Sequence, residues 1–219
     1  MSAMARRTYG GVSAELRREQ RRTALLDAAL EIIGTRGFSA LTVAGLCSQA
    51  GLNERYYYES FTDRDSVLAA LVKRITAELV TVMAAAANVA TPRTPRAIAH
   101  AGLSAAIQLS TDDPRKARVW FIEAPVNEEL ARHRAQVIRP FIALMLDQVA
   151  GHLGPDASRR AGEQATLTGT FLFGGFAETV TGWLRGDLPI TRTQLIDHAV
   201  DLFVHVAAHL YPPSTASPA

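Results

Sequence analysis

The sequence has a single cysteine and no long hydrophobic run, and both absences narrow what the chain can be. One cysteine in 219 residues excludes an intrachain disulfide framework and fits a reducing compartment. Arg6 and Arg7 are followed by no apolar segment, so the N-terminus lacks the pattern of an export signal. The longest weakly polar run, residues 165–177, is too short to span a bilayer and contains threonines and glycines. The sequence therefore predicts a cytoplasmic protein with no membrane partner.

The motifs of the common catalytic sites are also missing. There is no phosphate-binding glycine loop, no Gly-x-Ser-x-Gly and no paired-carboxylate motif. His205 and His209 share a helix face, but Val206 stands where a zinc protease helix needs glutamate. Histidines near the negative end of a helix dipole are the simpler interpretation. We expect no enzyme activity, no catalytic residue, no metal site and no cofactor.

Charge is nearly balanced overall but uneven along the chain. The 23 Lys and Arg against 21 Asp and Glu argue against a nonspecific coat on nucleic acid. Residues 1–22 hold six arginines and two glutamates, a net charge of +4, which leaves −2 for the remainder. The arginines at 17, 18, 21 and 22 either form a solvated face or contact phosphates. Residues 1–12 are expected to be a flexible arm, with a minor-groove role as the lesser alternative.

Residues 41–68 contain two short amphipathic helices joined by a glycine turn. Thr42 can cap the first helix and Gly51 ends it. Apolar residues recur at i, i+3, i+4 and i+7 on this helix, at Val43, Leu46, Cys47 and Ala50. Because Cys47 belongs to this stripe, core packing is favoured for it over redox sensing.

The second short helix has distinct inner and outer faces. Asn53 is expected to cap it, and Leu52 can pack on Tyr57 as a hydrophobic staple. Tyr57 and Phe61, four residues apart, face inward. The outer face, with Tyr58 on its flank, carries Arg55, Tyr56 and Glu59. This layout is typical of a helix-turn-helix at about residues 42–61, so the chain is predicted to read DNA.

The sequence around this motif resembles the N-terminal DNA-binding domain of TetR-type regulators over residues 18–75. This sequence and the family pattern both contain an amphipathic helix, a Gly-aromatic pair, a Thr-Val pair and an Ala-Gly turn. Both then have a helix that ends in aromatic residues, followed by a basic residue next to acidic ones. The matching positions are Gly37, Phe38, Thr42, Val43, Ala50, Gly51, Tyr58, Phe61 and Arg64. The resemblance implies a DNA-binding domain followed by a larger helical domain that binds a ligand and dimerises.

The chain departs from the family pattern in its recognition helix. Glu59 stands where the family usually has a histidine near a phosphate, and Ser60 replaces the second aromatic residue. Arg55 can place its planar fork on guanine O6 and N7. Glu59 either orients Arg55 through an i, i+4 pair or accepts from a cytosine amino group. The predicted DNA-contacting residues are Thr42, Asn53, Glu54, Arg55, Tyr56, Tyr58, Glu59 and Arg64, of which Tyr58 and Arg64 are expected to hold phosphates.

Helical periodicity fills the rest of the chain, so the fold class is all-α. A helix is predicted from Ser13 to about Arg36, closed by Gly37, with its inner face formed by Leu16, Leu25, Leu26, Ala29, Leu30, Ile32 and Ile33. A capping box over residues 62–65 begins a long helix to about Ala87, which could couple two domains. Further helices are expected at about 95–110, 114–124, 127–152 (kinked at Pro140), 157–185 and 192–210. The predicted domains are an arm (1–12), a helix-turn-helix domain (13–64), a ligand-binding and dimerisation domain (65–211) and a disordered tail (212–219).

Two C-terminal segments carry an association signal. Residues 165–185 combine small and large residues, namely Gly169, Phe171, Phe173, Gly174, Gly175, Phe176, Gly182 and Trp183. The last predicted helix gathers on one face Leu195, Ala199, Leu202, Phe203 and Val206. A buried hairpin is the alternative, but a homodimer is favoured because two-fold symmetry doubles the few base contacts of one helix-turn-helix. The family resemblance also implies that these last two helices form the four-helix bundle of a dimer.

The resemblance also implies a small-molecule pocket among the middle helices, where apolar walls with a few polar groups are typical. Each candidate has an ordinary core or surface role as its alternative. The candidates are His100, Gln108, Trp120, Glu123, His133, Gln136, Thr166, Thr170 and Phe173.

The favoured function is a homodimeric transcriptional repressor that occupies a palindromic operator in double-stranded DNA and is released by a small-molecule effector. A helical carrier or enzyme that retains a vestigial DNA-binding domain is the alternative.

Overall fold

All secondary structure in the described part of the chain is helical, as the sequence predicts. The computed structural model describes residues 13–126, 128, 131, 135–136 and 157–210, with the side chains of all except 157–166, 209 and 210. The predicted arm, the tail and Pro140 lie outside these residues. The chain divides into two compact units between Leu71 and Val72.

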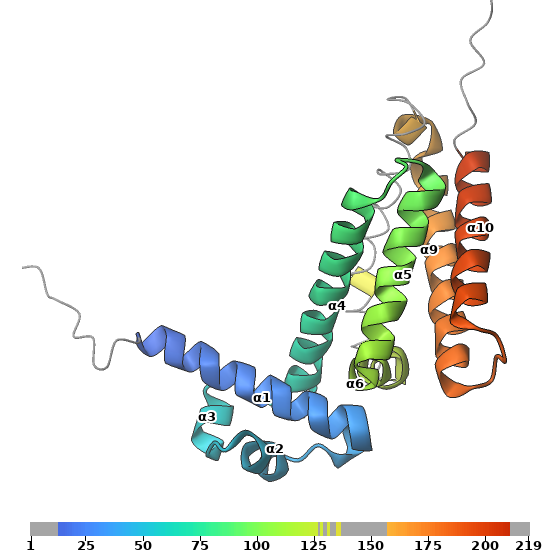
Figure 1. Cartoon of the computed structure of the whole chain (residues 1–219). Helices are drawn as coiled ribbons and strands as arrows, with labels where there is room; N and C mark the ends of the chain where they lie inside the picture. Colours follow the sequence, from blue (N-terminus) through green and yellow to red (C-terminus); the bar gives the residue numbers. More distant parts are fainter. Residues whose placement is uncertain (1–12, 127, 129–130, 132–134, 137–156, 211–219) are drawn as a thin grey trace, which may run out of the picture. The chain divides into compact units, whose positions relative to one another are not determined.

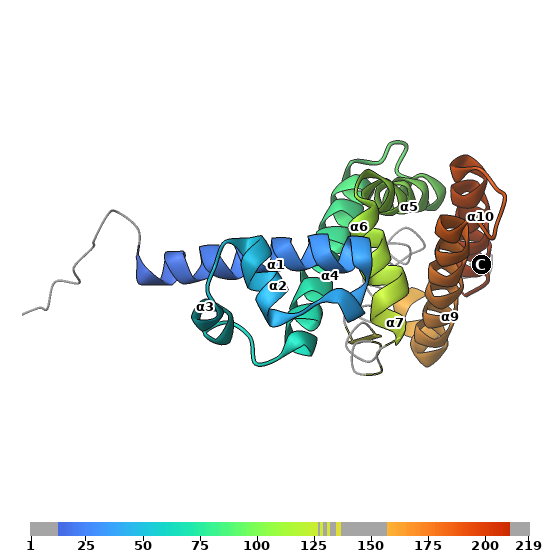
Figure 2. The same cartoon turned by 90° about the horizontal axis from the view of Figure 1, so that it is seen from below.

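The first unit is built from three complete helices and the start of a fourth. These are α1 (Ala14–Arg36), α2 (Val43–Ala50), α3 (Glu54–Tyr58) and the first turns of α4 (Arg64–Val89), with a short 3-10 turn, η1 (Phe38–Ala40), after α1. Figure 2 shows α2 and α3 against α1. The first helix therefore has its predicted range, and α2 and α3 lie within residues 42–61, where the helix-turn-helix is predicted.

Local sequence sets each helix boundary in this unit. Ser13, Thr42 and Asn53 cap α1, α2 and α3 by accepting a first-turn N–H at 3.1, 3.0 and 3.3 Å, respectively. Gly37 (φ 87°) follows α1 and Gly51 (φ 65°) follows α2, and both adopt a positive φ that side chains disfavour. The tight turn between α2 and α3 thus depends on glycine.

The core of the first unit lies between α1, α2 and the start of α4. Its buried residues are Leu25, Leu26, Ala29, Leu30, Ile32, Ile33, Leu41, Leu46, Cys47, Tyr57, Phe61, Val67, Leu68 and Leu71. Leu16, predicted on the inner face of α1, is instead 51% exposed. The prediction is wrong there because residues 13–20 are all exposed, and the core begins further along the helix.

The capping box of α4 is displaced by one residue from its predicted position. Asp63 precedes the helix, and its Oδ1 accepts the Ser66 N–H at 2.7 Å. Ser66 Oγ in turn accepts the Asp63 N–H at 3.2 Å, so Ser66 closes the box in place of Asp65. The Ser66 N–H also lowers the pKa of the Asp63 carboxyl below its ordinary value.

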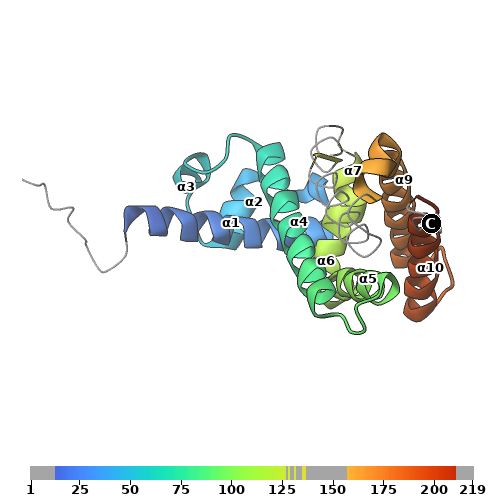
Figure 3. The same cartoon turned by 90° about the horizontal axis from the view of Figure 1, so that it is seen from above.

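The second unit is a bundle that begins with the later turns of α4. It continues through α5 (Pro95–Asp112), α6 (Pro114–Ala117), a π-helical segment η2 (Arg118–Glu123), α7 (Ala124–Val126), α9 (Ala157–Arg185) and α10 (Arg192–Leu210). In this unit α10 runs alongside both α5 and α9 (Figure 1; Figure 3). The predicted helices at 95–110, 157–185 and 192–210 are confirmed, while most of 127–152 lies outside the described residues.

The predicted break at Pro125 is wrong, because the helical path continues to Val126. Pro125 is the second residue of α7, which follows η2 without a break. The sequence also gave no sign of the π-helical segment that precedes it. Trp120 in that segment donates from Nε1 to Thr76 Oγ1 on α4 at 2.9 Å. The π segment thus places a buried indole against α4, and the hydrogen bond satisfies its N–H.

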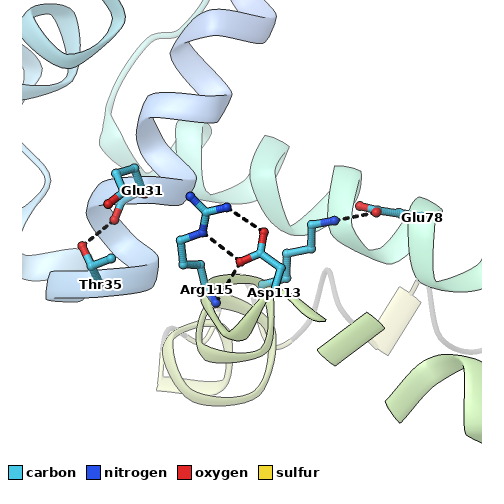
Figure 4. A network of polar contacts seen from close by, with 6 residues as sticks. Glu31, Thr35, Glu78, Asp113 and Arg115 are labelled. Atoms are coloured by element: carbon cyan, nitrogen blue, oxygen red, sulfur yellow. Dashed lines mark hydrogen bonds and ion pairs between the residues drawn. The ribbon is translucent and has the colours of Figure 1, made fainter. Parts of the chain in front are cut away.

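Ion pairs hold the short α6 in the second unit. Lys116 Nζ donates to Glu78 Oε1 of α4 at 2.5 Å. Figure 4 shows Arg115 donating to Asp113. Nε and Nη2 of Arg115 reach the two Asp113 oxygens at 2.8 and 2.9 Å. This paired arginine lowers the pKa of the Asp113 carboxyl. Asp113 also caps α6, so one carboxylate fixes where the helix begins.

Among the described helices, none has the length and apolar character needed to cross a membrane. Within the same ranges, no group of three His, Cys, Asp or Glu residues is placed to hold a metal ion.

Candidate nucleic-acid interface

The inner face of α3 anchors the helix in the core of the first unit. Tyr57 and Phe61 are buried, as predicted, with ring centroids 6.0 Å apart. Burial raises the pKa of the Tyr57 phenol, with a smaller contribution from the charge of Asp63. Among the described residues, the Tyr57 hydroxyl has no hydrogen-bond partner. This packing fixes which side of the short helix faces outward.

The outer face of α3 presents hydrogen-bonding side chains to solvent. The Arg55 side chain is 83% exposed, Tyr58 is 62% exposed, and Glu54 is exposed as well. The Tyr58 ring stands edge-on against Tyr57, 5.1 Å between centroids, which limits its movement. The predicted orientation of Arg55 and Tyr58 is therefore observed.

Glu59, at the end of α3, is bound by three arginines. Its Oε1 accepts from Arg55 Nε at 3.2 Å, and its Oε2 lies 3.4 Å from Arg21 Nη2. Arg18 Nη2 donates to the Glu59 main-chain carbonyl at 2.8 Å. Of the two roles predicted for Glu59, the pair with Arg55 is present in the structure.

The arginines of α1 contact the α3 segment, a role that the sequence interpretation missed. The Arg21 guanidinium carbon lies 4.3 Å from the centroid of the Tyr56 ring. The corresponding distance from Arg22 to the Phe61 ring is 5.1 Å. Tyr56 is half-buried as a result. A signal was available, because positions 18, 21, 22 and 25 share one helix face, and Leu25 on that face is buried.

Arg64, predicted to hold a phosphate, makes contacts within the first unit. Its Nη1 donates to the Leu41 carbonyl at 2.9 Å, and its guanidinium carbon lies 5.7 Å from the Phe38 ring centroid. The residue is nonetheless exposed. A guanidinium has five N–H donors, so one that binds the protein can still present others to a phosphate. Arg64 therefore connects α4 to the segment that precedes α2.

Thr42 and Asn53, also predicted to contact DNA, use their side-chain oxygens as helix caps. Both remain exposed, so each fixes a helix start beside the outer surface. Cys47 is buried in the α2 stripe, and burial raises the pKa of its thiol, with a smaller contribution from Glu54. A higher pKa disfavours the reactive thiolate, which fits a packing role.

The second unit contains a cavity between the η2–α7 segment and α9. Its volume is about 410 Å³, and its lining includes Phe121, Ile122, Thr170, Phe173 and Arg185. Two of the predicted ligand-binding residues, Thr170 and Phe173, therefore line one space. Trp120 packs edge-on against Phe173 with centroids 6.3 Å apart, in the wall behind it. This combination of aromatic walls with a few polar groups is typical of a small-molecule site.

The remaining predicted ligand-binding residues lie elsewhere or cannot be placed. His100 is exposed beside Asp197 at 3.7 Å, and Gln108 hydrogen-bonds to Asp112 and Arg192. Glu123 pairs with Arg118 at 3.2 Å. Gln136 is helical and exposed. His133 lies outside the described residues, as does the side chain of Thr166.

A second hollow follows the outer side of α9 and α10. This groove, of about 600 Å³, is lined by residues that include Phe171, Gly175, Phe176, Leu195 and Leu202. Phe171 is 79% exposed, and a Cβ added at Gly174 or Gly175 meets nothing within 4 Å. Of the residues predicted on the association face, Phe171 and Leu202 are thus exposed in the single chain, whereas Leu195 and Ala199 are buried within it.

The comparisons with known proteins agree with this geometry. Residues 25–71 match the family model described as "Bacterial regulatory proteins, tetR family". That range contains α2, α3 and most of the buried core of the first unit. No curated protein sequence matches the chain.

Solved structures share the fold across both units. The transcriptional regulator FadR from Bacillus subtilis, in complex with stearoyl-CoA, is 22% identical with a TM-score of 0.63, covering 87% of this chain and 98% of its own. A TetR-family regulator from Rhodococcus sp. is 21% identical (TM-score 0.65; 86% and 99% covered). A regulator from Pseudomonas aeruginosa PAO1 is 16% identical (TM-score 0.67; 91% and 98%). At these identities the likeness concerns the fold.

Proposed function

The N-terminal domain places this chain among the TetR-type transcriptional regulators, and from that premise we propose that it is a repressor. As a homodimer it occupies a palindromic operator, and a small molecule bound in the second unit releases it. The observation that carries the proposal is the outer face of α3. Arg55 and Tyr58 are exposed on a short helix that two buried aromatic residues hold in place. Such a helix can enter a major groove and bring an arginine to a guanine edge.

The division of labour on this face follows from side-chain type. Arg55, Tyr56 and Glu54 read bases, and Glu59 orients Arg55. Tyr58 and Arg64 bind phosphates, and Thr42 and Asn53 set the helix starts that position the face. One short helix supplies few base contacts, so two copies related by a two-fold axis are needed for a specific site. The apolar groove along α9 and α10 supports pairing of two chains.

The effector binds the cavity between η2–α7 and α9. Aromatic walls, together with Arg185 and Glu178 in its lining, support a ligand with an apolar body and a polar end. The B. subtilis neighbour was solved with stearoyl-CoA, which makes that molecule a reasonable first probe. These roles require a cytoplasmic protein that meets both DNA and metabolites.

Release of DNA by an effector has a defined energetic requirement. To weaken operator binding a hundredfold, the effector must bind the DNA-free state more tightly by about 2.7 kcal/mol. By reciprocity, saturating operator must weaken effector binding by the same factor. Calorimetric titration of the effector with and without operator measures both. Equal affinities in the two titrations would remove ligand release from the proposal.

A gel shift tests the DNA-binding part directly. We expect the protein to retard DNA from upstream of its own gene or of a neighbouring gene, and to do so less when Arg55 is replaced by alanine. Arg36→Ala is the matched control, because Arg36 is exposed in the last turn of α1, outside the recognition helix. If no upstream DNA is retarded while stearoyl-CoA or another ligand binds, the carrier alternative is the better account.

A further inference from the structure

Arg21 lies on α1, yet its side chain contacts two residues of the recognition segment. Its guanidinium carbon lies 4.3 Å from the Tyr56 ring centroid, and its Nη2 lies 3.4 Å from Glu59 Oε2. Its side chain is 25% exposed, against 83% for Arg55. A phosphate ligand needs free donors in solvent, whereas most of the Arg21 side chain is covered, by contrast with Arg55. Its surroundings therefore fit a residue that holds its neighbours in place.

Glu59 transmits this contact to Arg55. One carboxylate oxygen accepts from Arg55 Nε at 3.2 Å and the other faces Arg21. Because Glu59 binds the Nε side of Arg55, the terminal nitrogens of that guanidinium stay available. Those nitrogens form the fork that can reach guanine O6 and N7 together. A carboxylate held by Arg21 thus fixes the plane in which Arg55 presents its donors.

The same pairing explains how a glutamate is tolerated on a surface that meets DNA. An unpaired carboxylate there would repel phosphates and would have free oxygens for a cytosine amino group. With both oxygens facing arginines, and its carbonyl bound by Arg18 at 2.8 Å, Glu59 is neutralised and held at its side chain and its backbone. This arrangement favours orientation of Arg55 over direct reading of cytosine.

We propose that Arg21 is a positioning residue for sequence readout: through Glu59 it fixes Arg55, and through the Tyr56 ring it fixes the outer face of α3. Arg21 itself binds neither base nor phosphate. The inference rests on the proposed DNA-binding function. It predicts that a residue outside the recognition helix determines preference at the base pair that Arg55 reads.

Selection of sites from random duplex DNA by the full chain, followed by titration of the enriched duplex at several salt concentrations, tests this. Arg21→Ala is expected to lower preference at the Arg55 base pair by about fivefold or more, without changing the salt slope. Arg21→Lys is expected to fail in the same way, because an ammonium cannot stack on Tyr56 and pair with Glu59 as a planar fork does. Arg36→Ala is the control and should keep the parent's preference and slope.

The outcomes separate the alternatives. If Arg21→Ala keeps the preference but lowers the salt slope by about 1, and lysine restores it, Arg21 is a phosphate ligand and the inference is wrong. A double Arg21→Ala/Arg55→Ala variant should have the same preference at the Arg55 base pair as Arg55→Ala alone, because Arg21 acts there only through Arg55. If thermal unfolding shows that Arg21→Ala does not fold, Glu59→Gln takes its place, and unchanged preference in that variant contradicts the inference. Failure of the parent protein to enrich any sequence would instead reject the proposed function.

Discussion

Two helices of this chain, α3 and α9, leave a face exposed, and the two faces have opposite chemistry. The exposed side of α3 is polar, and its Arg55 side chain, 83% exposed, is paired with Glu59. The exposed side of α9 is apolar, with Leu167 at 72% and Phe171 at 79% exposure. Side chains orient one another on the first face, whereas glycines leave open space on the second.

The difference shows what each face requires from a partner. A polar face is stable in water, so its hydrogen-bond donors can be arranged to match a DNA sequence without lowering the stability of the free chain. Fully burying one large apolar side chain contributes about 1.5–3 kcal/mol of free energy. The exposed apolar side chains of α9 make no such contribution in the single chain and could make it in a dimer. The proposed function therefore gives selective recognition to the first face and strong association to the second.

The largest expected effect comes from placing a charge on the α9 face. Phe171→Glu should raise the dissociation constant of the proposed dimer at least about a hundredfold, about 2.7 kcal/mol, because an unpaired carboxylate would have to be buried. Sedimentation equilibrium at micromolar concentration measures it. Leu16→Glu is the control, since Leu16 is also an exposed large apolar residue but lies on α1. A Phe171→Glu protein that remains dimeric would place the interface elsewhere.

On the α3 face the expected effect is smaller and selective. Arg55→Ala should cost about 1–3 kcal/mol at one G·C pair per half-site and leave other positions unchanged. Competition binding with single-base variants of the enriched duplex checks this. Preference that survives intact at every position would mean that Tyr56 or Glu54 reads the bases.

Replacing Arg64 tests whether a contact to a phosphate can be distinguished from a contact that reads a base. Arg64→Ala should weaken all sequences alike and lower the salt slope by about 1, because a phosphate contact carries no sequence information. It should also lower the free energy of unfolding, since Arg64 donates to the Leu41 carbonyl. Arg64→Lys keeps the charge and should keep the slope. A change in base preference with Arg64→Ala would contradict the assignment.

The smallest expected effect is a gain in stability beneath the α3 face. Tyr57→Phe removes a buried hydroxyl without a described partner and should raise the free energy of unfolding by about 1 kcal/mol, measured by urea titration. Burial raises the Tyr57 pKa, so the unfolded chain ionises first, above pH about 10, and stability falls as pH rises further. The phenylalanine variant should lack this part of the alkaline loss. Equal stability of the two proteins at neutral pH would show that the hydroxyl is satisfied in solution.

The sequence predicted best where structure is set by near neighbours. Thr42, Gly51 and Asn53 fix the ends of α2 and α3 through contacts within a few residues, so periodicity and capping rules located them. The Arg55–Glu59 pair could also be predicted, because an i, i+4 spacing places both side chains on one helix face.

Contacts between segments that are distant in the sequence could not be predicted from it. Arg21 and Glu59 are 38 residues apart, and their pairing depends on how α3 packs against α1. The π-helical segment around Trp120 follows from packing against Thr76, which no local pattern encodes. The cavity of about 410 Å³ joins the segment around Phe121 with Phe173 on α9, and no local pattern in the sequence pairs these two segments.

We propose that the α3 face reads DNA while the α9–α10 face pairs two chains to do so. Selection of sites from random duplex DNA, with light-scattering mass measurement of the resulting complex, tests both parts together. The account predicts an inverted repeat with half-sites about 10 base pairs apart, each containing a G·C pair sensitive to Arg55→Ala, bound by two chains or a multiple of two. A single asymmetric site occupied by one chain, or no enriched sequence at all, would contradict it.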